Sequence, residues 1–286
     1  MADKKVVLEL KEKSYELRKK LLLLAAAFGQ PVHMGGDLSV VEILTVLYHY
    51  GMNIDPKNIR MPTRDRFILS KGHAAVGMYI TMAIRGFFDY DEIVRTYGKL
   101  DTAFGMHPCK VQLPGVEISS GSLGQGLAIS CGLALAGRAR KEAHRVFCLM
   151  GDGETCEGEV WESAMTAASY NLGNLIGIVD RNRQFMTSFS EKAVKLEPYA
   201  AKWKAFGWRV VEIDGHDMAT IVNAIDNLPA ATDDTPTVII GNTVKGHGVS
   251  FMENNVAWHA GMVSEDDWNK AKDELNAAYK KKGGAV

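Results

Sequence analysis

Two polar residues, Asp152 and Asn182, carry the clearest chemical signal in the sequence. Asp152 stands between two glycines in Gly151-Asp152-Gly153, and Asn182 follows 30 positions later. Carboxylate and amide oxygens are hard ligands that suit Mg²⁺ or Ca²⁺, and the Gly153 N–H and a following helix N-terminus can donate to an anion. The Gly-Asp-Gly segment alone would indicate no more than a turn. Combined with Asn182, it predicts a divalent metal that joins the protein to a diphosphate.

The elements around these residues place them at one edge of a sheet. Residues 146–150 form an apolar run typical of a buried strand, residues 159–170 predict a helix, and residues 175–179 predict a second buried strand. A strand, a helix and a strand in this length form a parallel βαβ unit. Because the carboxyl ends of parallel strands share an edge, where open α/β sheets bind ligands, we expect Asp152 and Asn182 to be neighbours.

The rest of the pattern predicts an α/β fold with a parallel sheet and helices on both faces. We expect one domain over residues 1–286. The further predicted helices span residues 7–28, 40–50, 127–140, 199–206 and 266–279, with another from about residue 218, and the further strands span 67–69, 208–213 and 237–241. The segment Val32 to Ser39 is expected to be a loop in which Asp37 or Ser39 caps the next helix.

Composition narrows the classes of function. Lys and Arg number 33 and Asp and Glu 34, a net charge of −1, which gives no electrostatic basis for binding nucleic acid. The apolar run Leu21 to Phe28 is too short to span a membrane, and no signal peptide is expected. The four cysteines show no CxxC spacing, so we expect a reducing, cytoplasmic setting.

Four histidines lie in polar or glycine-containing loops at predicted strand ends: His33, His73, His107 and His259. Imidazoles titrate near neutrality, so this set could move protons to and from a bound substrate. A single loop histidine is more often a surface residue, but four on separate loops are hard to explain as core packing. We rank His247 below His259 and expect His216 to be structural.

The Gly-Asp-Gly segment with its later Asn resembles the thiamin-diphosphate motif. Three more segments resemble the transketolase family, and in particular its separately encoded N-terminal subunits: Ser70-Lys71-Gly72-His73, Gly105-Met106-His107-Pro108 and Gly121-Ser122-Leu123. The resemblance covers nearly all of this chain and only the diphosphate-binding third of a full-length transketolase. It implies the thiamin-diphosphate-binding fold of the diphosphate-binding (PP) type.

The resemblance implies thiamin diphosphate and Mg²⁺ as cofactors, with Ca²⁺ or Mn²⁺ as alternative ions. The implied metal ligands are Asp152, Asn182 and the backbone carbonyl of Gln184. The implied cofactor-binding set is His73, Gly121, Ser122, Leu123, Gly151, Asp152, Gly153, Glu157, Asn182, Met186 and His259. In this set the backbone of Gly121 to Leu123 lines the aminopyrimidine, Met186 packs on the thiazolium, and Glu157 couples to the other active site across a subunit interface.

Several residues depart from the family pattern, among them Met106, which separates Gly105 from His107. Asp37 stands where the family usually has Ser, Met186-Thr187-Ser188 where it usually has Ile-Asp-Gly, and Ala260 where a Gly usually follows the histidine. A flexible thioether at Met186 can still fill an apolar role. The changed residues at 187 and 188 predict a different local shape for this loop.

The implied activity is transfer of a two-carbon ketol unit from a ketose phosphate to an aldose acceptor, with His33, His73, His107 and His259 as catalytic residues. The glutamate that activates the cofactor lies in a domain absent from this chain. The resemblance therefore implies a C-terminal partner subunit with the pyrimidine-binding domain, an α2β2 assembly, and pairing through residues 127–140. Alternatives are a subunit like 1-deoxyxylulose-5-phosphate synthase or dihydroxyacetone synthase, and a non-catalytic, phosphate-binding regulatory subunit.

Overall fold

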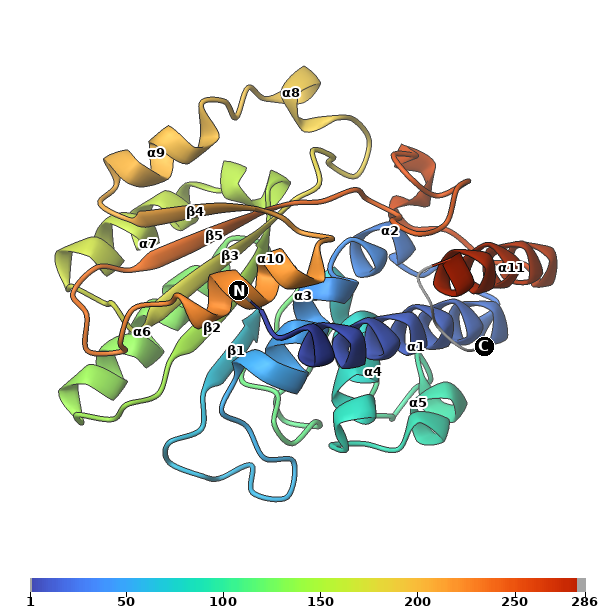
Figure 1. Cartoon of the computed structure of the whole chain (residues 1–286), viewed down its shortest axis with the longest axis horizontal. Coiled ribbons are helices and arrows are strands. Elements are labelled where there is room, and N and C mark those ends of the chain that lie inside the picture. The colour runs from blue at the N-terminus through green and yellow to red at the C-terminus, as the bar shows by residue number, and fades with distance from the viewer. Residues whose placement is uncertain (1, 282–286) are drawn as a thin grey trace.

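The computed structural model describes residues 2–281 and contains a five-stranded sheet. All of its strand pairs are parallel, and the strand order is β1-β2-β3-β5-β4. Figure 1 shows the twisted sheet with helices on both sides. The strands are β1 Arg66–Leu69, β2 Val146–Gly151, β3 Leu175–Arg181, β4 Arg209–Asp214 and β5 Thr237–Asn242. Each predicted strand is present, and the prediction of a parallel α/β fold is confirmed.

Alternating side chains of each strand build two separate cores. Phe147 and Leu149 of β2 point into the larger core, whereas Cys148 and Met150 point into the smaller one. The larger core takes residues from α1 Lys4–Phe28, α2 Met34–Leu38, α3 Val41–Val46, α4 Ala75–Arg85, α5 Tyr90–Thr96, α10 Met218–Asp226 and α11 Glu265–Lys281. The smaller core takes residues from α6 Gln125–Ala139, α7 Gly158–Ser169 and α9 Tyr199–Ala205.

The long helix α1 shows how local sequence fixes an element. The Asp3 carboxylate accepts a hydrogen bond from the Lys5 N–H at 2.8 Å and caps the amino end. Gly29 ends the helix in a left-handed conformation with φ 62°, which a side chain would disfavour. Leu17, Leu21 and Leu24 are buried on the face between these ends. Among residues 2–281, no helix is both long and apolar enough to cross a bilayer.

The segment Val32 to Ser39 corrects two predictions. Residues 34–38 form the short helix α2 instead of a loop, and neither Asp37 nor Ser39 caps α3, whose cap residue Val40 makes no side-chain cap bond. The Asp37 carboxylate instead accepts from the Gly77 N–H of α4 at 2.8 Å. The Ser39 hydroxyl donates to the Asp180 carboxylate at 2.6 Å. Both side chains are buried and join α2 to neighbouring elements, an outcome that local capping patterns do not encode.

Candidate functional site

The four predicted histidines lie together at the carboxyl edge of the sheet. The His33 ring centroid lies 5.6 Å from that of His73, 5.9 Å from that of His107 and 5.5 Å from that of His259. The centroids of His73 and His259 are also 5.5 Å apart. The four residues come from the start of α2, the turn after β1, the loop at residues 105–108 and the turn Val256–His259.

Most ring nitrogens in this cluster are free to meet a ligand. Among the hydrogen bonds of the described residues, the rings of His33, His73 and His107 donate and accept none, whereas His259 Nδ1 lies 2.8 Å from Lys245 Nζ. Burial, and after it the nearby Lys71, lowers the pKa of His73 well below its ordinary value. Burial and Lys245 lower the pKa of His259 to about 3. These two rings are therefore neutral at pH 7. The His73 ring keeps an unused acceptor nitrogen, whereas the His259 Nδ1 lone pair already accepts from Lys245.

Asp152 and Asn182 are close neighbours, as strand pairing requires. Gly151 of β2 pairs with Asp180 of β3, and the N–H of Arg183 donates to Asp152 Oδ2 at 2.9 Å. Asp152 Oδ1 accepts one further bond, from the Gly153 N–H at 2.9 Å. Asn182 Oδ1 accepts from the Gln184 N–H at 3.0 Å, which brings the third predicted metal ligand to the same turn.

The residues at this turn fit a divalent metal. Asp152 and Asn182 offer two side-chain oxygens, and the loop adds backbone carbonyls, the donor types that Mg²⁺ prefers. Burial and the neighbouring Asp180 raise the pKa of Asp152, against the opposing effect of Arg181, so a cation would relieve buried negative charge. Both polar atoms of the Gln184 side chain are also buried without a partner among the described residues.

Two buried lysines, which the sequence did not predict as site residues, also belong to the site. Lys71 Nζ donates to Asp180 Oδ2 at 2.6 Å and to the Gly36 carbonyl at 3.0 Å. Lys245 Nζ donates to the Phe185 carbonyl at 3.0 Å, and burial together with the charge of Lys71 lowers its pKa to about 8. Cations beside the Asp152 turn suit the negative charge of a diphosphate. Each lysine follows the end of a strand, a signal that could have identified it.

Glu154, which the sequence also did not predict as a site residue, connects three segments of the site. Its carboxylate accepts from the Ser70 hydroxyl, from the Gly124 N–H at 3.0 Å and from the Gly151 N–H at 3.0 Å. These partners belong to the turn after β1, the glycine-rich loop before α6 and the end of β2. Because one buried side chain holds all three, their relative positions are fixed without a ligand.

The glycine-rich loop lies directly against the histidine turn. A Cβ added to Gly72 would lie 2.8 Å from the Gly121 backbone nitrogen, so this approach requires glycine. A Cβ on Gly121 would in turn lie 3.3 Å from the His107 ring. Residues 121–123 therefore border the histidine cluster. Met186 and Glu157 face solvent instead, Met186 with 64% of its surface exposed.

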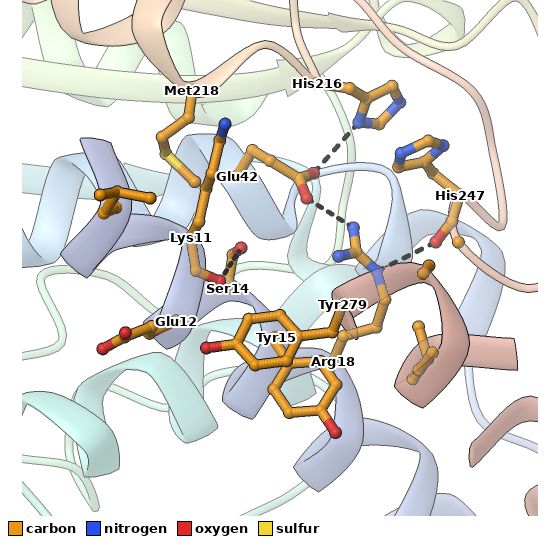
Figure 2. Close-up of a pocket in the computed structure, with 14 residues that line it drawn as sticks. Lys11, Glu12, Ser14, Tyr15, Arg18, Glu42, His216, Met218, His247 and Tyr279 are labelled. Atoms are coloured by element: carbon orange, nitrogen blue, oxygen red, sulfur yellow. Dashed lines mark hydrogen bonds and ion pairs between the residues drawn. The ribbon is translucent and has the colours of Figure 1, made fainter. Parts of the chain in front are cut away.

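A second histidine cluster lies where α1 and α11 meet the loops after β4 and β5, beside a cavity of about 150 Å³ (Figure 2). His216 Nδ1 is 3.1 Å from Glu42 Oε2, and Arg18 Nη2 is 2.7 Å from Glu42 Oε1. The His247 ring stacks on that of His216, with centroids 3.6 Å apart. Glu42, His216 and His247 lie close enough to suggest a metal site.

Hydrogen bonding argues against a metal at this second cluster. His216 Nε2 accepts from the Val244 N–H at 2.8 Å, so the ring proton is on Nδ1 and is donated to Glu42. That tautomer leaves no lone pair for a cation, and Glu42 is already neutralised by Arg18. The bonds agree with the structural role predicted for His216.

The fold and the site define a parallel α/β protein with oxygen ligands for a metal, buried cations and free imidazoles at the carboxyl edge of its sheet. The chain belongs to the family described as the transketolase thiamine diphosphate binding domain, whose model matches residues 21–282. The prediction of an N-terminal, thiamin-diphosphate-binding transketolase subunit is thereby confirmed.

Several relatives are themselves named as subunits. The chain is 40% identical over 267 residues to one subunit of the apulose-4-phosphate transketolase of Actinobacillus succinogenes, covering 93% of this chain and 96% of that protein. It is 38% identical to the 6-deoxy-6-sulfo-D-fructose transketolase subunit of a Clostridium species, covering 85% and 88% of the two chains. The transketolase structure from Campylobacter jejuni matches with a TM-score of 0.85 and 28% identity, covering 96% of this chain but 43% of that one.

Proposed function

We propose that this chain holds the diphosphate of thiamin diphosphate, together with Mg²⁺, for ketol transfer. The observation that carries the proposal is the convergence of four histidine rings, connected to the loop after Asn182 by Lys245. Lys245 Nζ lies 2.8 Å from His259 Nδ1 and donates to the Phe185 carbonyl at 3.0 Å. Asp152, Asn182 and the Gln184 carbonyl would hold the metal, and Lys71 and Lys245 would balance the diphosphate charge. Ca²⁺ and Mn²⁺ suit the same oxygen ligands.

When bound, thiamin diphosphate supplies the carbon nucleophile for transfer of the two-carbon unit. The chain contributes proton transfer and orientation through His33, His73, His107 and His259. A neutral ring nitrogen accepts the proton of the sugar hydroxyl as the carbon–carbon bond breaks, and the imidazolium returns it to the acceptor oxygen. The lowered pKa values of His33, His73 and His259 favour the neutral form, in which His33 and His73 keep an unused acceptor nitrogen.

The substrates we propose are a ketose donor with an anionic far end and an aldose acceptor. The relatives support this class, because their names specify a sugar phosphate in one case and a sulfonated sugar in another. A ketose phosphate is the first donor to test.

We propose that a C-terminal subunit supplies the pyrimidine-binding domain and its catalytic glutamate, in an α2β2 assembly. The names of the relatives as subunits support a partner. Helix α6 offers a surface for it: Ile129 and Leu135 are 40% and 41% exposed, and a Cβ on Gly132 would meet nothing within 4 Å. Glu157 and Met186, both exposed here, would be covered in that assembly. The four free cysteines fit a reducing, cytoplasmic setting.

Reconstitution tests the proposal. The chain, its C-terminal partner and their mixture are each assayed for ketol transfer with a ketose phosphate, thiamin diphosphate and Mg²⁺. We expect turnover in the mixture alone. Turnover by the single chain would refute the need for a partner, and a mixture that forms a complex and binds the cofactor but transfers no ketol unit from any anionic ketose would refute the activity.

A further inference from the structure

Arg181, the last residue of β3, contacts the carboxylate proposed to bind the metal. Its side chain is 2% exposed, and its Nη1 lies 2.8 Å from Asp152 Oδ2. Its Nη2 lies 3.0 Å from Glu191 Oε1 and 2.8 Å from Glu197 Oε1. The guanidinium also stacks over the Tyr199 ring, 4.6 Å from its centroid. One buried arginine thus gathers three carboxylates and an aromatic ring.

This contact distinguishes the two oxygens of Asp152. Oδ2 accepts from Arg181 Nη1 at 2.8 Å and from the Arg183 N–H at 2.9 Å, whereas Oδ1 accepts from the Gly153 N–H alone among the described residues. A carboxylate oxygen has about two lone-pair sites, so Oδ2 is fully used and Oδ1 retains one. We propose that Arg181 is a positioning residue that fixes Asp152 so that Oδ1 faces the metal. This inference rests on the proposed function.

The sign of the effect follows from the charges around Arg181. A positive charge beside a metal ligand would by itself weaken cation binding. Here, however, the guanidinium is in contact with Glu191 and Glu197 as well as Asp152, so its charge is more than neutralised within 3.0 Å. Removing it would leave Asp152 buried without its ion-pair partner and free to rotate. Loss of orientation should therefore dominate, and metal affinity should fall.

The same guanidinium attaches the segment from Phe189 to Tyr199, which lies at the top of Figure 1 and includes α8 Ser190–Ala193. Glu191 and Glu197 reach Arg181 from this segment. A second connection runs from the Tyr199 hydroxyl to Thr155 Oγ1 at 3.1 Å and from Thr155 Oγ1 to the Asp152 carbonyl at 2.7 Å. Arg181 therefore holds both the segment and Asp152 in place, and a change at Arg181 should make both more mobile.

Metal binding by the complex with its C-terminal partner tests the inference. Mn²⁺ affinity is measured by electron paramagnetic resonance in the presence of thiamin diphosphate, and cofactor affinity by calorimetry at saturating Mn²⁺. Arg181→Met should weaken Mn²⁺ binding about 10–100-fold, the range for loss of a residue that orients a metal ligand. Cofactor affinity at saturating metal should stay within about threefold, whereas a collapsed site would lose both.

Two variants complete the test. Arg181→Lys keeps the charge but lacks the planar fork, so it should restore part of the Mn²⁺ affinity, and it provides the measurement if Arg181→Met fails to fold. Arg209→Met removes a half-exposed arginine of β4 that pairs with Asp233, and it should change nothing. Unchanged or tighter Mn²⁺ binding in both Arg181 variants would overturn the inference. A wild-type complex that binds no Mn²⁺ with the cofactor would overturn the proposed function, and this inference with it.

Discussion

In the first histidine cluster, the rings of His33, His73 and His107 have no hydrogen-bond partner among residues 2–281. After β4, by contrast, His216 commits both of its nitrogens to Glu42 and the Val244 backbone. Both regions combine histidines, a buried cation and a buried carboxylate at the same edge of the sheet. They differ in whether the polar atoms have protein partners. Residue types and proximity are therefore weak guides to a functional site, and uncommitted ring nitrogens are a better one.

The pKa shifts of the buried charged residues also differ between the two regions. Burial raises the pKa of Asp37 to about 7 and, with the charge of Lys71, lowers that of Lys245 to about 8, so folding disfavours both charges. Burial alone would raise the pKa of Glu42, yet Arg18 and His216 lower it to about 2. Folding thus disfavours the charges of Asp37 and Lys245 beside the proposed site and favours the charge of Glu42, a contrast expected between a binding site and a structural cluster.

Removing the proposed metal ligand should have the largest effect. Asp152→Ala should abolish Mg²⁺-dependent binding of thiamin diphosphate, a loss of more than about 10³-fold, because the diphosphate then lacks its metal. Calorimetry on the assembled protein measures this. Asp214→Ala, at the end of β4, is the matched control and should bind normally. Equal affinity in wild type and Asp152→Ala would remove Asp152 from the site.

The next effect is on turnover. His73→Ala and His107→Ala should each lower kcat/KM by about 10²–10⁴-fold, the range for loss of a proton-transfer group, while cofactor affinity stays largely intact. His247→Ala, in the second cluster, should lower it less than about threefold. Steady-state kinetics with a ketose phosphate compares the three. A normal kcat/KM would exclude that histidine from the catalytic set, and a large loss in His247→Ala would break the distinction between the regions.

A change in the second cluster should lower the stability of the protein. Glu42→Gln should lower the free energy of unfolding by about 3–5 kcal/mol at pH 7, because it leaves Arg18 buried without its charge partner. The Glu42 pKa of about 2 in the folded chain lies below its ordinary value of 4.5, so its stabilisation is present above pH 4.5 and is lost as the pH falls toward 2. Urea unfolding at pH 7 and pH 3 measures both. An unchanged unfolding energy at pH 7 would contradict the structural role.

Asp37→Asn should give the smallest effect, and with the opposite sign. The folded pKa of about 7 exceeds the ordinary 3.8, so the folded chain holds an extra proton between these values and stability falls as the pH rises through them. The variant cannot ionise and should be about 1–3 kcal/mol more stable than wild type at pH 8, because a tenfold change in a protonation equilibrium is worth about 1.4 kcal/mol. At pH 4 the two should be nearly equal. A difference that does not change with pH would show that Asp37 ionises normally.

Periodicity was sufficient to predict the fold. Apolar runs such as residues 146–150 and 175–179 gave the strands, and parallel pairing then required Asp152 and Asn182 to meet. Helix α2 was missed because its two glycines are typical of a loop. Its conformation depends on tertiary bonds, including that from the Ser39 hydroxyl to Asp180.

Several residues of the site could not be predicted from the sequence. Lys71, Lys245 and Glu154 are buried charged residues whose partners come from distant segments, and a local sequence pattern cannot show that a charge is buried. The sequence places Arg181 only at a strand end, since nothing in it brings Glu191 and Glu197 to that side chain. The four histidines were predictable because each belongs to a recognisable loop.

Locating a bound metal tests the central distinction most directly. The complex with the C-terminal partner is crystallised with Mn²⁺ and thiamin diphosphate, and the ion is found by its anomalous scattering. We predict a peak within bonding distance of Asp152, Asn182 and the Gln184 carbonyl, with the four histidines facing the cofactor. A peak between Glu42, His216 and His247, with none at Asp152, would contradict the account.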